Sequence, residues 1–267
     1  MSDTQIFENA FVSSTDVMEH PVFIPTSQGV FGATITTPQG ESRAAMVIMA
    51  GLSEERSGAN SIWRTMAQSI ASSGVTVLRY DSAGVCDSHL TAEGDEGDEG
   101  TLEVIRWFRQ ATDGLPLVAL GYCKGVKFAL TLAMEDPAPI AVGLMCPPKR
   151  YLPKIAPTGA RRVRSSLSSM FKKPIVTDSQ EEDDPEVEFF VRAPTRAPTW
   201  ILLGSEDRGA DEARGFAIGN RHGERLRLDV VEGVEVHWFT TPAIQREVTT
   251  RVISWTETVL ETLPKGT

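Results

Sequence analysis

Short apolar runs recur along this chain, and segments with helical spacing separate them. Each run is rich in Val, Ile or Leu and lacks the alternation of a half-exposed strand; the runs are residues 45–50, 75–80, 117–121, 140–145 and 199–204. Strands that are covered on both faces have this composition. The helical segments are residues 61–72, 101–110, 126–135 and 244–263. This order predicts an α/β fold with a mostly parallel, doubly wound sheet.

Two segments depart from that rhythm. Residues 21–36 predict an antiparallel hairpin. Residues 149–197 contain no convincing strand, begin basic and then turn acidic. A structureless loop of that length is uncommon in a compact domain, so we expect a small helical lid insertion with one helix at 163–171, or alternatively a mobile surface excursion. The predicted organisation is a core of residues 1–148 and 198–267 with a lid at 149–197.

Charge and cysteine content exclude several classes of protein. The 267 residues carry 26 basic and 36 acidic side chains, a net charge of −10. This argues against nucleic acid as the main ligand, because phosphate binding relies on Lys and Arg. No apolar run approaches the roughly 18 residues that span a bilayer, and residues 1–10 lack the features of a signal peptide. The three cysteines suit no disulfide framework or zinc site. We expect a cytoplasmic protein without a membrane or nucleic-acid partner.

The run of Gly, Asp and Glu at residues 94–100 raises the question of a calcium site. Its acidic positions do not follow the D-x-[DN]-x-[DN]-G pattern of an EF-hand loop. We therefore expect a solvated loop there, and the sequence indicates no metal and no organic cofactor.

The most informative motif is Gly121-Tyr122-Cys123-Lys124-Gly125, called the elbow below. It follows the apolar run 117–121 and precedes the helical segment that starts near Val126. A G-x-S-x-G nucleophile elbow has this spacing, here with cysteine in place of serine. Its glycines leave room for a tight strand-to-helix turn. The N-terminus of the following helix favours negative charge, so we expect it to promote a thiolate at Cys123. Cys86 and Cys146 are expected to be small buried hydrophobic residues.

Two further residues complete a candidate catalytic set. Asp207 comes just after the apolar run 199–204, and His237 follows a short predicted strand at 226–231. The order nucleophile, acid, base is that of α/β-hydrolases. Glu206 and Asp211 are alternatives to Asp207 as the acid.

The chain resembles an α/β-hydrolase from about residue 21 to residue 263. Four elements carry the resemblance: Gly51 after the first apolar run, the D-x-x-G-x-x-D-S element of residues 81–88, the elbow, and Gly204-Ser205-Glu206-Asp207 followed by His237. The 81–88 element and the lid resemble capped serine-aminopeptidase-like and exosortase-associated hydrolases. The start of the elbow is similar to that of dienelactone hydrolases, which also use a cysteine.

The resemblance implies a role for each residue. Cys123 attacks an acyl carbon, His237 accepts the thiol proton, and Asp207 orients the imidazole. The backbone N–H groups of Lys124 and Leu52 are expected to form the oxyanion hole.

Cysteine in place of serine bears on the substrate. A thiolate leaves a tetrahedral intermediate more easily than an alkoxide does, so attack on an ordinary ester tends to reverse, whereas attack on a thioester or another activated acyl donor proceeds. We therefore expect a thioesterase or acyltransferase that forms an acyl-cysteine. The basic residues 161–173 could contact coenzyme A or a carrier protein, or could form a solvated helix face. The alternatives are a dienelactone-hydrolase-like lactone or ester hydrolase, and a non-catalytic ligand-binding member of the fold.

Overall fold

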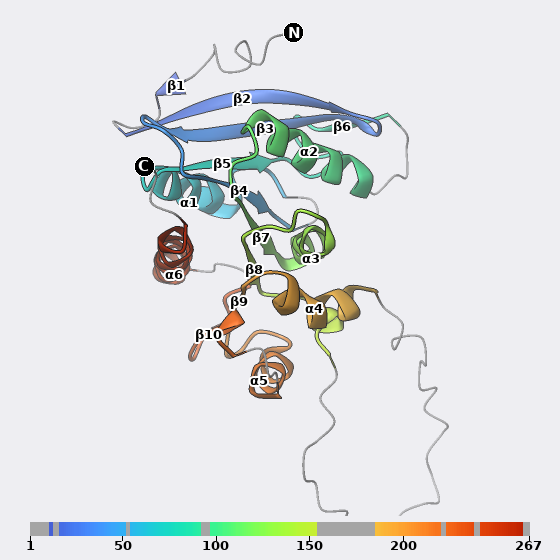
Figure 1. The fold of residues 1–267 in the computed structure, drawn as a ribbon, viewed down its shortest axis with the longest axis vertical. Coiled ribbons are helices and arrows are strands. Elements are labelled where there is room, and N and C mark those ends of the chain that lie inside the picture. Colours follow the sequence, from blue (N-terminus) through green and yellow to red (C-terminus); the bar gives the residue numbers. More distant parts are fainter. Residues whose placement is uncertain are drawn as a thin grey trace, which may run out of the picture.

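The computed structural model describes residues 11–12, 16–51, 54–91, 97–153, 185–219, 223–237 and 241–263. Its strands form one sheet in the order β1-β2-β3-β5-β4-β7-β8-β9-β10, and β6 pairs with β3 (Figure 1). The strands are β1 Phe11–Val12, β2 Val17–Thr26, β3 Gly29–Pro38, β4 Ala44–Met49, β5 Val75–Tyr80, β6 His89–Leu90, β7 Leu117–Tyr122, β8 Ala141–Met145, β9 Thr199–Gly204 and β10 Leu226–Val231.

The central strands are parallel, as the apolar runs predict. β5, β4, β7, β8, β9 and β10 pair in parallel with one another, one after the next. Every residue of β4, β5, β7, β8 and β9 is buried, which explains why these segments lack alternation. The predicted hairpin is also confirmed: β2 and β3 pair antiparallel and turn at Ser27 and Gln28. The α/β class and the doubly wound sheet are therefore as predicted.

Helices cover both faces of the sheet (Figure 1). They are α1 Ile62–Ala71, α2 Asp98–Ala111, α3 Val126–Met134, α4 Pro185–Arg196, α5 Ala210–Gly219 and α6 Pro242–Glu261. Buried residues of α1 and α6 share one apolar cluster, and those of α2, α3, α4 and α5 share the other. No helix in these described ranges has the length and apolar composition needed to cross a membrane.

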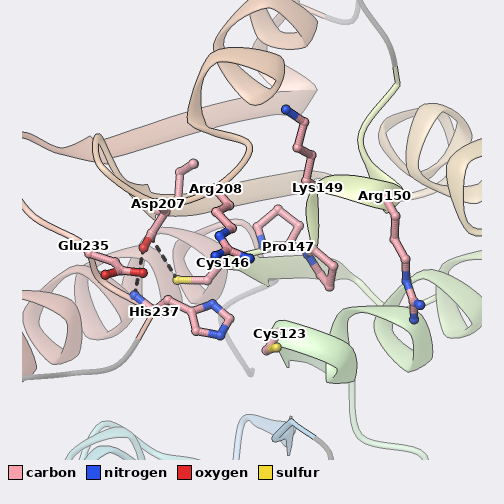
Figure 2. A pocket seen from close by; sticks show the side chains of 11 residues that line it. Cys123, Cys146, Pro147, Lys149, Arg150, Asp207, Arg208, Glu235 and His237 are labelled. Atoms are coloured by element: carbon pink, nitrogen blue, oxygen red, sulfur yellow. Dashed lines mark hydrogen bonds between the residues drawn. The ribbon is translucent and has the colours of Figure 1, made fainter. Parts of the chain in front are cut away.

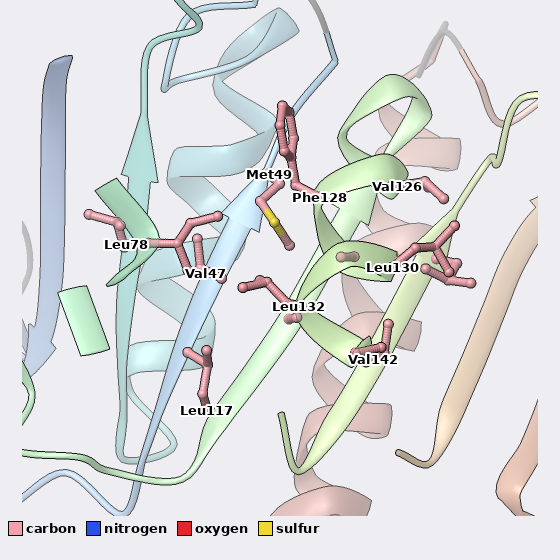
Figure 3. Close-up of a cluster of buried hydrophobic side chains, with 14 of the residues drawn as sticks. Val47, Met49, Leu78, Leu117, Val126, Phe128, Leu130, Leu132 and Val142 are labelled. Atoms are coloured by element: carbon pink, nitrogen blue, oxygen red, sulfur yellow. The ribbon is translucent and has the colours of Figure 1, made fainter. Parts of the chain in front are cut away.

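The cluster beneath α3 fixes that helix against the centre of the sheet. Val126, Leu130 and Leu132 of α3 pack with side chains of β4 and its neighbours, including Val47 and Met49 (Figure 3). These residues are fully buried. At about 25 cal/mol per Å² of apolar surface, such burial is the main stabilising contribution to the fold. It also holds the start of α3 at the carboxyl end of β7.

The part of the predicted lid that the structure describes at its C-terminal end, α4, belongs to the apolar cluster of α2, α3 and α5. α4 packs against α3, and its Phe190 is 1% exposed and contacts the Phe216 ring of α5 at a centroid distance of 5.2 Å. The start of the stretch forms a short 3-10 turn, Lys149–Tyr151. The helix predicted at 163–171 lies outside the described residues, and the lid boundaries stay a prediction.

The acidic run 94–100 is only partly a loop. Residues 98–100 form the first turn of α2, where Asp98 and Glu99 stabilise the helix dipole. Asp98 also forms an ion pair with Lys127 of α3. The expectation of a solvated loop is therefore wrong for these three residues, because they begin a helix whose N-terminus the charges of Asp98 and Glu99 stabilise.

Candidate active site

The elbow forms a strained turn between β7 and α3. Cys123 has a φ of +51°, in the left-handed region, and begins the 3-10 turn Cys123–Gly125 that leads into α3. Such a conformation costs a non-glycine residue on the order of 1–3 kcal/mol and is often found at functional sites. The packing around the elbow maintains it.

Steric contacts explain why both of these elbow positions are glycine. A Cβ on Gly121 would lie 2.7 Å from the carbonyl oxygen of Gly125, and one on Gly125 would lie 2.0 Å from the carbonyl oxygen of Met49. Neither glycine has a positive φ. Both are therefore required for close approach of the backbone rather than for conformational freedom.

The Cys123 thiol is half-buried, and its burial raises its pKa. A hydrogen bond from the Lys124 backbone N–H acts in the opposite direction and favours the thiolate, but its effect is smaller. The backbone N–H at the start of this turn therefore promotes the thiolate, but desolvation of the charged form outweighs its effect on the pKa. A nucleophilic Cys123 needs a base to accept its proton.

Asp207 lies in the loop that follows β9 and is 6% exposed. Its Oδ1 accepts a hydrogen bond of 3.0 Å from the His237 backbone N–H, and its Oδ2 accepts one of 2.7 Å from the Gly204 N–H. The carboxylate thus joins the end of β9 to the segment that carries His237. The predicted contact of Asp207 with the imidazole itself stays a prediction. Glu206 and Asp211, the alternative acids, are exposed.

His237 follows β10 and lies beside the elbow. Its carbonyl oxygen accepts a hydrogen bond from the Tyr122 hydroxyl, and the two rings are 5.6 Å apart between centroids. In Figure 2 the imidazole extends from the His237 backbone toward Cys123. Tyr122 and Asp207 therefore hold the His237 backbone from two sides and place its ring near the candidate nucleophile.

A cavity of about 410 Å³ brings the three predicted residues together (Figure 2). Its lining consists of Cys123, Asp207 and His237 together with Cys146, Pro147, Pro148, Lys149, Arg150, Leu203, Arg208 and Glu235. These residues lie at the carboxyl ends of β7, β8 and β9 and in the loop after β10, where α/β sheets place their ligands.

The predicted oxyanion hole is described in part. Lys124 follows the nucleophile directly, and its N–H is close enough to bond the Cys123 sulfur. Leu52 lies outside the described residues. Gly51, which precedes it, borders the nucleophile, since a Cβ there would lie 3.6 Å from the Cys123 Cβ.

Sequence reasoning missed the proximity of Glu54 to the nucleophile. The Trp63 indole N–H donates to Glu54 Oε2 at 2.9 Å, and a Cβ on Gly51 would lie 3.3 Å from Glu54 Oε1 and 3.6 Å from the Cys123 Cβ. Burial raises the pKa of Glu54, and its negative charge in turn raises the pKa of Cys123. The only signal in the sequence was its place in the loop after Gly51.

Cys146 also takes part in this site. It follows β8 as Cys123 follows β7, and Tyr122 pairs with Met145 in the parallel ladder. Its buried thiol donates to Asp207 Oδ2 at 3.5 Å. The expected burial of Cys146 is correct, whereas Cys86 is exposed, because it lies in a turn after β5 rather than at a strand end.

The 81–88 element is a structural support for the neighbouring loop. Asp81 is 1% exposed. It accepts a 2.7 Å hydrogen bond from the Arg56 backbone N–H and forms an ion pair with the Arg56 guanidinium. The Ser88 hydroxyl bridges the Asp81 carbonyl and the Gly32 N–H. Within the described ranges no group of three or more His, Cys, Asp or Glu residues could hold a metal ion.

Comparison with known proteins gives consistent results for the fold. A family model described as alpha/beta hydrolase fold matches residues 45–165. No curated protein matches the sequence significantly. A serine hydrolase without a lid from Xanthomonas campestris is 13% identical, with a TM-score of 0.60, over 96% of this chain and 100% of that one.

Two other similar structures are named as enzymes. A dienelactone hydrolase from Anabaena variabilis is 14% identical, with a TM-score of 0.59, over 91% of this chain and 98% of that one. A Pyrobaculum calidifontis esterase is 16% identical, with a TM-score of 0.63, over 97% of this chain and 93% of that one. Together with the sheet order and the elbow, these matches show that the chain has the α/β-hydrolase fold.

Proposed function

We propose that this protein is an acyl-transfer enzyme, a thioesterase or acyltransferase, that forms a covalent acyl-cysteine at Cys123. One observation carries the proposal: a cysteine held at φ +51° in the elbow lines one cavity with His237 and Asp207. A half-buried, strained cysteine beside a histidine suits nucleophilic catalysis.

The chemistry has two steps. In the first, the Cys123 sulfur bonds to the acyl carbon while its proton passes to His237, and the carbonyl electron pair moves onto oxygen. Collapse of this intermediate breaks the bond to the leaving group, which takes the proton from His237. In the second, water or an amine attacks the acyl-cysteine, gives its proton to His237 and releases the Cys123 thiol.

The raised pKa of Cys123 fits this sequence. Burial raises the pKa of the Cys123 thiol and so favours its protonated form at rest. Proton transfer to His237 then accompanies attack, so the site does not hold a permanently reactive thiolate. The Lys124 N–H is available for the oxyanion of the intermediate.

The cysteine favours activated donors over ordinary esters. In the tetrahedral intermediate the better leaving group departs, and a thiolate departs more readily than an alkoxide. A thioester or an activated lactone therefore allows forward collapse. Coenzyme A or a carrier protein would suit as the source of the acyl group.

Two other functions are alternatives to this proposal, and each predicts a different experimental result. The fold similarity to a dienelactone hydrolase favours a lactone or ester hydrolase as the second candidate. A non-catalytic member would use the same cavity only to bind a ligand. It would form no covalent adduct.

Intact-protein mass spectrometry tests the proposal. The protein would be mixed with acyl thioesters and activated esters in a Cys86→Ala background, because the exposed Cys86 thiol could react without catalysis. We expect an acyl mass increment that is lost in Cys123→Ala and retained in Cys146→Ala. Absence of adduct and of donor consumption across the panel would contradict it.

A Cys123→Ser variant separates the first two candidates. A lactone or ester hydrolase retains turnover with serine, since an alkoxide nucleophile suits esters. A transferase that depends on aminolysis of a thioester loses transfer or shifts to hydrolysis. Unchanged transfer in Cys123→Ser would contradict the proposed role of the sulfur.

A further inference from the structure

We propose that a second cavity, called the arginine cavity below, binds the phosphate group of a small phosphate monoester. The cavity measures about 280 Å³ and shares no lining residue with the catalytic cavity. The inference is therefore independent of the proposed function. The polar and charged side chains of its lining are those of Glu19, Thr34, Arg56, Ser57, Arg64 and Arg79.

The arginine cavity lies on the face of the sheet that α1 covers. Thr34 of β3 pairs with Arg79 of β5, so both side chains are on one face. α1 packs against β3 and β5 (Figure 1) and contributes Arg64. The loop after β4 adds Arg56 and Ser57. Four segments of the chain thus bring hydrogen-bond donors to one cavity.

Arg79 is the buried cation of this cavity, and one of its donors is unused. Its side chain is 3% exposed. Its Nη2 donates to Glu19 Oε1 at 2.6 Å, and its Nη1 donates to the Arg56 carbonyl oxygen at 2.9 Å. Its buried Nε has no acceptor in the part of the chain that the structure describes. Buried donors are nearly always bonded, so this one points to an acceptor that comes from outside the chain.

Two guanidinium groups of the cavity share a single carboxylate. Arg79 bonds to Glu19 Oε1, and Arg64 Nη2 bonds to Oε2 of the same side chain at 2.9 Å. These three side chains together carry one positive charge in excess. Guanidinium groups that are not fully balanced favour an oxyanion as a further partner.

The third arginine is balanced from outside the cavity. Arg56 forms ion pairs with Asp81 and, at 2.6 Å, with Asp87, and neither aspartate lines the cavity. Over both groups, three guanidinium groups face three carboxylates, which lets this network form without a ligand. On the cavity side the donors outnumber the acceptors, so a ligand has to supply oxygen atoms.

The pKa of Arg79 agrees with this excess of positive charge. Burial is the main cause that lowers the pKa to about 10. The charge of Glu19 opposes this decrease, whereas the charges of Arg64 and Arg56 add to it. A phosphate bound among these groups would act in the same direction as Glu19 and stabilise the charged guanidinium.

The arrangement of the donors favours a phosphate over a carboxylate. Thr34 and Ser57 add hydroxyl groups to the lining beside the guanidinium groups. A tetrahedral phosphate presents oxygen atoms in several directions, whereas a carboxylate presents two in one plane. The volume of about 280 Å³ is close to the lower limit, roughly 300 Å³, of small-molecule pockets. We therefore expect a phosphate on a short carbon chain.

Isothermal titration calorimetry of the full chain with glycerol 3-phosphate tests this site. Glycerol is the neutral match, and glycerate carries a carboxylate in place of the phosphate ester; pH and ionic strength are held constant. We expect one glycerol 3-phosphate per chain, an affinity for glycerate that is lower on the order of tenfold, and no binding of glycerol.

Two variants place the ligand in the arginine cavity. Arg64→Gln leaves Glu19 paired with Arg79 alone and removes the excess charge, so it should weaken binding on the order of tenfold or more. Thr34→Val keeps every ion pair and the shape of the side chain, and should weaken binding by about threefold to tenfold. It tests the site even if Arg64→Gln folds poorly.

Arg192→Gln is the matched control. Arg192 is 55% exposed, against 49% for Arg64, and it pairs with Glu188 on α4. This variant should bind glycerol 3-phosphate as wild type does.

Three results would overturn the inference. The first is no binding of glycerol 3-phosphate beyond that of glycerol, and the second is an equal affinity for glycerate. The third is binding that Arg64→Gln and Thr34→Val both leave unchanged, because the phosphate would then occupy another site.

Discussion

At the scale of single residues, the environment of Cys123 balances two opposing demands. Burial and the Glu54 carboxylate raise the pKa of the Cys123 thiol, while the Lys124 N–H and the positive charge of Arg150 lower it. Such a balance suits a nucleophile that should ionise only when substrate and His237 are in place. The sequence could locate this cysteine from its glycines, but not this balance, because Glu54 and Arg150 reach it through space.

Replacing Glu54 with Gln should lower the pKa of Cys123. A negative charge nearby disfavours the thiolate, so its removal increases the thiolate fraction at any pH below that pKa. The pH profile of Cys123 alkylation by iodoacetamide, read by peptide mass spectrometry, should shift to lower pH. Glu55→Gln is the control: Glu55 raises the pKa of Cys86 instead, so Cys86 alone should become more reactive. An unshifted Cys123 profile in Glu54→Gln would contradict this electrostatic effect.

Asp207 should contribute to stability as well as to the site. Asp207→Ala removes the acceptor for the buried N–H of Gly204 and for the N–H of His237, and each unsatisfied donor costs about 1–3 kcal/mol. We expect a loss of about 2–4 kcal/mol in the free energy of unfolding, measured with urea. Glu206→Ala removes an exposed neighbour and should change it by less than about 0.5 kcal/mol. Equal stability of the two variants would refute a structural role for Asp207.

At the scale of elements, strands were more predictable than helices. The central strands agree with their apolar runs to within one residue, because full burial leaves an unmistakable composition. α4 and α5 were not predicted as separate helices. In α4 only Phe190, Ala193 and Pro194 are buried, and Pro194 lies inside the helix, where the sequence suggests a break. Contacts with α3 and α5 stabilise α4. Because these contacts join segments that are apart in the sequence, the local pattern of apolar residues does not predict them.

The elbow itself can be tested through its second glycine. Gly125 has an ordinary helical φ of −60°, so an alanine there is strained not by its φ but by contact with the backbone carbonyl groups of Met49 and Ala50. Gly125→Ala should reduce the free energy of unfolding by about 3 kcal/mol, in the range of overpacked cores, and should shift Cys123 away from His237. Gly40→Ala, with open space around its Cβ, is the control and should be neutral or slightly stabilising. A Gly125→Ala variant as stable as Gly40→Ala would show that the elbow can relax.

At the scale of the whole molecule, the sheet has one long exposed edge. β1 pairs only with residues 18 and 19 of β2. The rest of β2 therefore has no neighbouring strand on its outer side in the described ranges. Pro21, Phe23 and Pro25 lie at alternate positions there and are all exposed, with Phe23 at 66%. Prolines are accommodated on edge strands where an N–H would face solvent, and they block pairing with another chain.

The two prolines should therefore keep the edge of β2 from self-association. A Pro21→Val/Pro25→Val double variant regains two backbone donors and adds β-branched side chains on either side of the exposed Phe23, which favours strand pairing between molecules. We expect a larger mass than wild type by size-exclusion chromatography with light scattering, increasing with protein concentration. Thr195→Val adds a similar exposed side chain on α4, away from any sheet edge, and should not change the mass. If the double variant matches wild type and this control at every concentration, the prolines do not protect the edge, and the short strand β1 is sufficient to cover it.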